Sequence, residues 1–259
     1  MPRTESEENG LFLRIYGPPK PRGTLLVLHG LGDWGGSYEG LVTAPPLSGL
    51  RVLVPDLPGY GRSPRPAIPR TLAGLADDLA LWLGKRGEGA VTLLGHSMGG
   101  VVAQLIAERH PESTTALVNV EGNISKEDCS MSGRAASQSA RTFIREGFKS
   151  MLEALDASGK EDPGAAAYAR SARMSDPAVF HLHSCELVAL SEAEDLAQRM
   201  AKLAMPAHYV AGSPGGAGPR SIALLARAAV PVSVIRPAGH CPFLDQPAAF
   251  LRAVAKMMP

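Results

Sequence analysis

The sequence predicts an α/β fold, in which helices cover both faces of a mostly parallel β-sheet. Short, continuously apolar runs recur along the chain, as expected for strands that are buried on both faces of such a sheet. Residues 24–28 and 51–54 are examples. Stretches with helical spacing separate most of these runs, and this alternation is typical of parallel sheets with helices on both sides. A length of 259 residues allows one large domain, or one domain with an insertion.

The expected strands follow from these runs in chain order. Residues 1–10 are expected to be loose, and Leu11–Tyr16 alternates apolar and polar residues, as a first strand does. The remaining expected strands are 24–28, 51–54, 91–94, 116–120, 207–211 and 231–235.

The expected helices lie between the strands. Residues 71–83 carry leucines at helical spacing on one stripe, which is the pattern of an amphipathic helix. A pair of prolines interrupts the helix that we expect within 36–50. The other helices expected in this part of the chain are 101–108 and 247–257.

Residues 123–205 differ from the rest of the chain. This stretch is rich in Ala, Ser, Arg and Met, and it shows helical patterns but no strand pattern. Its expected helices are 137–157, 164–174 and 191–203. We therefore expect a helical insertion at 123–205 within a core domain that is formed by 1–122 and 206–259.

The composition argues against several classes of function. The formal charge is +1, from 26 basic and 25 acidic residues, and no basic stripe alternates with aromatic residues, so we expect no nucleic-acid partner. We expect the polar, acidic N-terminus to be neither a signal peptide nor a membrane anchor, and no apolar run reaches the roughly 18 residues of a membrane span. Cys129, Cys185 and Cys241 lie far apart, which favours free thiols and a cytoplasmic protein. No ligand set has convincing metal-binding spacing, and we expect neither a metal nor a cofactor.

A candidate nucleophile lies in the sequence Gly95-His96-Ser97-Met98-Gly99. An apolar strand precedes this G-x-S-x-G pattern and a helical pattern follows it, so Ser97 is expected at the tip of a sharp strand-to-helix turn. Bulky neighbours would clash there, which explains the two glycines. The turn also aims the N–H of Met98 and the helix N-terminus at one point, where an oxyanion is stabilised. The alternative is a glycine-rich turn with a capping serine.

A serine nucleophile needs a base, and His240 is the best candidate among the seven histidines. It lies in a loop directly after a buried strand, and open α/β sheets place their sites at the carboxyl ends of strands. The alternative is a loop histidine that caps the last helix.

Together, these motifs resemble those of the α/β-hydrolase superfamily. The matching stretches are His29-Gly30, the loop Asp56-x-Pro-Gly-x-Gly-x-Ser63, the Ser97 motif and Gly239-His240, in the family's order. The resemblance implies an α/β-hydrolase fold with a helical cap at 123–205. It also implies that Ser97 is the nucleophile and His240 the base, and that the backbone N–H groups of Leu31 and Met98 form the oxyanion hole.

The catalytic acid departs from the usual pattern. The family usually carries it as Gly-x-x-Asp after the strand that ends here at Ala211, but this chain has no Asp or Glu between Ala207 and Phe243. A minority of the superfamily places the acid one strand earlier, where this chain has Glu121 followed by Gly122. We therefore assign Glu121 as the acid. The alternative is a surface carboxylate at the hinge of the cap.

Four further residues are candidates for the substrate pocket. Asp33 and Trp34 follow the expected oxyanion strand and are placed to line the pocket entrance. Phe143 and Phe148 belong to the apolar residues of the insertion, and they either line an apolar pocket or form the core of the cap.

Two aspartates are expected to have structural roles. Asp56 is expected to fix the turn of its Pro/Gly loop rather than to take part in chemistry. Asp245 is expected to cap the closing helix.

These observations predict a cofactor-free serine hydrolase of the carboxylesterase type. Its partner would be a small acyl compound, such as an ester, a lactone or a thioester, which forms an acyl-enzyme on Ser97. An acyltransferase or cyclase that uses the same acyl-enzyme remains an alternative, as do a C–C bond hydrolase and a non-catalytic ligand receptor. The oligomeric state is left open.

Overall fold

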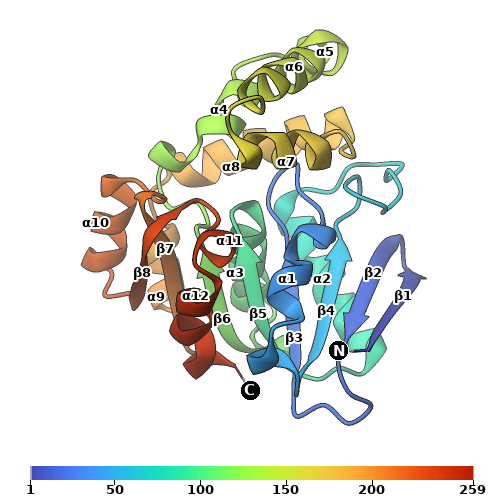
Figure 1. Cartoon of the computed structure of the whole chain (residues 1–259), viewed down its shortest axis with the longest axis vertical. Helices are drawn as coiled ribbons and strands as arrows, with labels where there is room; N and C mark the ends of the chain where they lie inside the picture. The colour runs from blue at the N-terminus through green and yellow to red at the C-terminus, as the bar shows by residue number, and fades with distance from the viewer. Residues whose placement is uncertain (1, 259) are drawn as a thin grey trace.

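The computed structural model describes residues 2–258 and contains an eight-stranded sheet with helices on both faces (Figure 1). The strand order is β1-β2-β4-β3-β5-β6-β7-β8, and every pairing from β4 to β8 is parallel. The strands are β1 (Arg3–Glu8), β2 (Leu11–Tyr16), β3 (Thr24–Leu28), β4 (Arg51–Asp56), β5 (Val91–His96), β6 (Thr114–Val120), β7 (Ala207–Gly215) and β8 (Val232–Gly239). The predicted α/β fold with a mostly parallel sheet is therefore confirmed.

The stretch 1–10 was expected to be loose, and for residues 2–10, which the structure describes, this expectation was wrong. Residues Arg3–Glu8 form β1, which pairs with β2 in an antiparallel ladder. All six side chains of β1 are polar, so the strand has no apolar alternation to reveal it. Its backbone pairing and ion pairs such as Arg62–Glu5 and Arg86–Glu8 hold it at the edge of the sheet.

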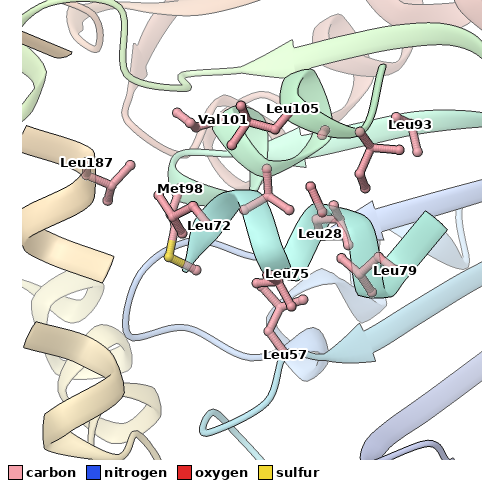
Figure 2. Packing of buried hydrophobic residues seen from close by; sticks show 14 of the residues in the cluster. Leu28, Leu57, Leu72, Leu75, Leu79, Leu93, Met98, Val101, Leu105 and Leu187 are labelled. Carbon is pink, nitrogen blue, oxygen red and sulfur yellow. The ribbon is translucent and has the colours of Figure 1, made fainter. Parts of the chain in front are cut away.

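The side chains of the central strands alternate between two buried layers. In β3, Leu26 and Leu28 pack on one face of the sheet, while Leu25 and Val27 pack on the other. The first face is covered by α2 (Leu72–Arg86), α3 (Met98–Arg109), α9 (Leu196–Ala201) and α10 (Pro219–Arg227). The second is covered by α1 (Glu39–Val42), α11 (Pro242–Asp245) and α12 (Pro247–Val254). Figure 2 shows the first layer, where leucines of α2 pack against the strands and α3.

The helices α4–α8 lie above the carboxyl ends of the parallel strands (Figure 1). They are α4 (Ser130–Ala136), α5 (Ala140–Thr142), a π-helical turn (Phe143–Gly147), α6 (Phe148–Ser158), α7 (Pro163–Ala172) and α8 (Pro177–Glu192). The chain then returns to the side of the sheet, where Arg199 of α9 pairs with Glu108 of α3 and the carbonyl of Leu196 accepts from Gln104 of α3. The cap boundaries 123–205 stay a prediction. None of the helices within 2–258 combines the length and apolar character that crossing a membrane requires.

The sequence pattern missed two helices of this region, α4 and the longer α8. We expected a helix at 191–203, whereas α8 ends at Glu192 and α9 begins at Leu196. Asp176 caps the start of α8 by accepting hydrogen bonds from Ala178 N and Val179 N. The helix is buried from several sides, so it lacks the single apolar stripe that marks an amphipathic helix.

The core and α8 are joined by a buried chain of hydrogen bonds. The Tyr60 hydroxyl donates to His183 Nδ1 over 2.8 Å, and His183 Nε2 donates to the carbonyl of Arg70 over 2.9 Å. One turn further along α8, Glu186 Oε2 accepts the N–H of Leu72 at the start of α2 (2.6 Å). These contacts fix α8 over the sheet.

A buried ion pair holds together the loops that follow β3 and β4. Arg14 of β2 donates to both carboxylate oxygens of Asp56, over 2.6 and 3.3 Å, and neither side chain is more than 1% exposed. Asp56 also accepts the N–H groups of Gly35 (2.7 Å) and Arg62 (2.8 Å). The structure therefore gives Asp56 the role of fixing these loops, as its position in the Pro/Gly loop indicates.

The Asp56→Asn substitution should lower the free energy of unfolding by about 3–5 kcal/mol, because it leaves the charge of Arg14 buried without a counterion. Urea unfolding at constant pH measures this change through the midpoint and the m-value. Asp78→Asn is the matched control. Its ion pair with Arg70 is about half exposed on both sides, and its loss should cost less than about 1 kcal/mol. Equal losses in the two variants would contradict the proposed role of Asp56.

Candidate active site

Ser97 lies at the tip of a sharp turn between β5 and α3. Strand β5 ends at His96, helix α3 begins at Met98, and Ser97 has φ 54° and ψ −123°. The turn is possible only with glycine on both sides. A Cβ at Gly95 would lie 2.1 Å from the carbonyl oxygen of Gly99, and a Cβ at Gly99 would lie 2.2 Å from that of Leu28. These contacts explain the spacing of the G-x-S-x-G pattern.

The turn after β3 lies against the serine and has a fixed peptide orientation. A Cβ at Gly30 would lie 3.1 Å from Cβ of Ser97. The carbonyl of Gly30 accepts hydrogen bonds from His29 Nδ1 (2.8 Å) and from Asp33 N (3.2 Å). Because the peptide is trans, the N–H of Leu31 points away from these two donors.

The side chain of His29 determines this orientation. Its Nε2 accepts the N–H of Leu57 over 2.9 Å, so in the neutral ring the proton is on Nδ1 and is donated to Gly30. His29 is fully buried, and burial lowers the pKa of its imidazole, so the ring is neutral at neutral pH. A second backbone N–H group, besides that of Leu31, belongs to Met98. Met98 is the first residue of α3, so its N–H has no carbonyl partner within the helix.

His240 and Glu121 form a pair beside this turn. His240 follows β8 directly, and its Nδ1 lies 3.2 Å from Oε2 of Glu121. The Glu121 side chain is 2% exposed, whereas that of His240 is 50% exposed. The second carboxylate oxygen, Oε1, accepts the N–H of Gly212 over 2.6 Å. Both oxygens of Glu121 thus have a partner, and the imidazole faces open space on its other side.

Glu121 reaches this place because glycines leave room for it. It follows β6 with a φ of 53°, and a Cβ at Gly216 would lie 2.3 Å from its Oε1. A Cβ at Gly212 would lie 2.0 Å from the carbonyl oxygen of Gly239. Strand β7 thus provides one N–H donor, from Gly212, and the loop after β7 provides space at Gly216 for the carboxylate of Glu121.

A cavity of about 530 Å³ opens at these residues. Ser97, His240, Glu121, Gly30 and Leu31 all border it. Among residues 2–258, no hydrogen bond joins Ser97 Oγ to His240, and catalytic hydrogen bonds are often longer in the absence of substrate than in its complex. The other side of the cavity is formed by the loop after β6, by α4, α7 and α8, and by the loop 215–218.

The four expected pocket residues have different surroundings. Asp33 borders the cavity, and burial raises the pKa of its carboxyl group. Trp34 instead stacks on the Arg14 guanidinium, with 4.7 Å between the guanidinium carbon and the ring centroid. Phe143 and Phe148 pack on Phe180 of α8 and form part of the core of the helical layer. In the part of the chain that is described, none of these three aromatic residues borders the cavity.

Two residues contact the site in ways that the sequence did not indicate. Tyr168 of α7 borders the cavity, and its hydroxyl donates to the carbonyl of Leu31 over 2.8 Å. Asp245 does not cap the closing helix as we expected, because its Oδ2 accepts the N–H of Gly239 (2.7 Å) instead. Both contacts join residues that are distant in the chain or separated by a turn, so no local pattern reveals them.

Cys241 also borders the cavity, next to His240 in the chain. Burial raises the pKa of its thiol to about 12, so the thiol is protonated at neutral pH and is a poor nucleophile.

Comparisons with known proteins agree with this architecture. Residues 23–209 match the family model for the alpha/beta hydrolase fold. A lipase from Mycobacterium tuberculosis, LipV, is 38% identical over 108 residues, which are 42% of this chain and 40% of the lipase. A pimeloyl-[acyl-carrier protein] methyl ester esterase from Citrobacter koseri is 29% identical over 77% of this chain and 80% of its own length.

Solved structures share the same fold. An enol-lactonase from Burkholderia xenovorans superimposes with a TM-score of 0.78 over 98% of both chains, at 22% sequence identity. The family model covers more than half of the chain, and the chain therefore belongs to the α/β-hydrolase family.

Proposed function

We propose that this protein is a serine hydrolase that cleaves a carboxylic ester or a related acyl compound through an acyl-enzyme on Ser97. The observation that carries the proposal is the buried Glu121 carboxylate on His240 Nδ1, at the same cavity as the strained turn of Ser97. A carboxylate in that position holds the proton on Nδ1 and leaves Nε2 free to accept the proton of a serine hydroxyl.

The steps of the reaction follow from this arrangement. Ser97 Oγ attacks the acyl carbon while His240 takes its proton, and Glu121 stabilises the imidazolium that forms. The N–H groups of Leu31 and Met98 stabilise the oxyanion of the tetrahedral intermediate. His240 then gives the proton to the leaving alcohol, and a water molecule that His240 activates releases the acyl group from Ser97.

The proposed substrate class is supported by the two relatives that are named as a lipase and as a methyl ester esterase. The chain matches less than half of the lipase, so this support concerns ester chemistry and not a particular ester. A small acyl compound is the partner that fits a cavity of about 530 Å³. Three free cysteines agree with a reducing compartment, and we propose the cytoplasm.

Wild-type protein should show a burst of p-nitrophenol from a short p-nitrophenyl ester, followed by steady turnover. Ser97→Ala should abolish both phases, because no acyl-enzyme can form. Stopped-flow absorbance measures the burst, and intact-protein mass spectrometry detects the acylated serine. Turnover by Ser97→Ala at the wild-type rate would contradict the assignment of the nucleophile.

Glu121→Gln should lower kcat by roughly 10³–10⁴-fold. The N–H of Gly212 selects the amide oxygen of the new side chain, so the amide NH₂ faces His240 Nδ1. The imidazole then carries its proton on Nε2 and cannot accept the proton of Ser97. Steady-state kinetics and circular dichroism separate this effect from misfolding.

Glu186→Gln is the control for Glu121→Gln. Glu186 also accepts a backbone N–H over 2.6 Å, from Leu72, but in the part of the chain that is described it does not border the cavity. Its substitution should leave kcat within about threefold of wild type, because the new amide oxygen still accepts the N–H of Leu72 and only the charge is lost. If Glu121→Gln keeps wild-type kcat, the acid must be another residue.

A further inference from the structure

The loop that carries His240 has little support from its own surroundings. His240 is half exposed, and β8, which precedes it, is the edge strand of the sheet. Besides backbone hydrogen bonds to Cys241 from Leu244 N and Asp245 N, two side chains bond to the backbone of Gly239 and His240. Gly239 N–H donates to Asp245 Oδ2 (2.7 Å), and the carbonyl of His240 accepts from His96 Nε2 (2.8 Å).

The protonation state of His96 follows from its two partners. A carbonyl oxygen only accepts, so Nε2 must carry the proton that it donates to His240. Nδ1 of the neutral ring is then an acceptor, and it receives the hydroxyl proton of Tyr38 over 2.8 Å. Burial lowers the pKa of His96 to about 3, so the ring stays neutral at the pH of ordinary assays.

The His96 ring is also fixed by packing. It is 4% exposed and contacts the ring of Phe243 edge-on, with 5.1 Å between centroids. Phe243 in turn stacks on Tyr38 at 5.0 Å. His96 is the residue that precedes Ser97, so its hydrogen bond runs directly from the nucleophile turn to the loop of the base.

We propose that His96 is a positioning residue that holds His240 at its working distance from Ser97, by donating Nε2–H to the His240 carbonyl. The inference rests on the proposed function, in which Ser97 is the nucleophile and His240 the base. His96 acts through His240 and takes no part in bond making itself. The hydroxyl of Tyr38 supports it by keeping the proton of His96 on Nε2.

The chain contains a matched arrangement at a distance from the base. His183 also accepts a tyrosine hydroxyl at Nδ1 (2.8 Å) and donates Nε2–H to a backbone carbonyl (2.9 Å), but its partners are Tyr60 and Arg70. His183 is 2% exposed, and burial lowers the pKa of its imidazole to about 4. A substitution at His183 removes the same kind of hydrogen bond without touching the loop of His240.

The experiment compares His96→Leu, His96→Gln and His183→Leu with wild type on a short p-nitrophenyl ester. His96→Leu should lower kcat by about a hundredfold, the effect of a misplacement of about 1 Å, and should change KM by less than about threefold. His96→Gln keeps an N–H donor near the position of Nε2. Its kcat should therefore be at least about tenfold higher than that of His96→Leu. His183→Leu should keep kcat within about threefold of wild type, and any displacement of α8, which borders the cavity, should change KM instead. Urea unfolding of each variant confirms that it is folded in the assay.

A second measurement reports the position of the base without turnover. The proton between His240 Nδ1 and Glu121 gives a downfield signal in the proton NMR spectrum, which His240→Gln assigns by its loss. This signal should broaden or disappear in His96→Leu and persist in His96→Gln and His183→Leu. A sharp signal and a wild-type kcat in His96→Leu would overturn the proposal, and so would an equal loss of kcat in His183→Leu.

The two proposals fail in different ways. Wild-type protein that forms no acyl-enzyme with any ester contradicts the proposed function, and the NMR signal of His96→Leu then still decides whether His96 holds the loop. Wild-type protein that is active, with a His96→Leu variant that is equally active, contradicts only the inference about His96.

Discussion

The packing of the first turn of α3 against the end of β3 is the constraint on which the site depends. Gly99 lies against the carbonyl of Leu28 with no room for a side chain, and this contact fixes the height of Ser97 above the sheet. It also places the turn after β3 next to the serine, as the close approach of Gly30 shows. The proposed nucleophile and the N–H groups proposed as oxyanion donors are thus placed by close backbone packing, which no side-chain substitution elsewhere replaces.

Two signals in the sequence made parts of the site predictable. One is a pair of glycines at positions with no room for a Cβ, and the other is the lack of a carboxylate where the family usually has one. Gly95 and Gly99 have no space for a Cβ, so Ser97 can be located from the spacing alone. The absence of acidic residues from 207 to 243 pointed to Glu121, and Glu121 is the carboxylate that contacts His240. Trp34, Phe143 and Phe148 could not be placed, because an aromatic residue that packs in a core has the same sequence signal as one that lines a pocket.

The fold also has elements that the sequence predicts and elements that it does not. Buried parallel strands are readable because both of their faces must be apolar, and these were placed to within a few residues. The polar edge strand β1 and the helix α8 were missed, since β1 depends on pairing with β2 and α8 on contacts from several sides. Asp245 shows the same limit at the site. Its carboxylate accepts the N–H of Gly239 across a turn of the chain. The sequence does not reveal this turn, so a helix cap was the expected role.

The position of Glu121 in the sheet has a consequence for His240. Strand β6, which carries Glu121, lies next to β5 in the sheet and is supported on both sides, whereas His240 follows the edge strand β8. The Glu121 side chain is therefore buried, whereas that of His240 is half exposed. A side-chain hydrogen bond of 3.2 Å to Glu121 cannot by itself fix the loop of His240, because the backbone can still rotate about that contact. The bonds from His96 and to Asp245 act on the backbone on both sides of the His240 Cα, which is where such a rotation must be stopped.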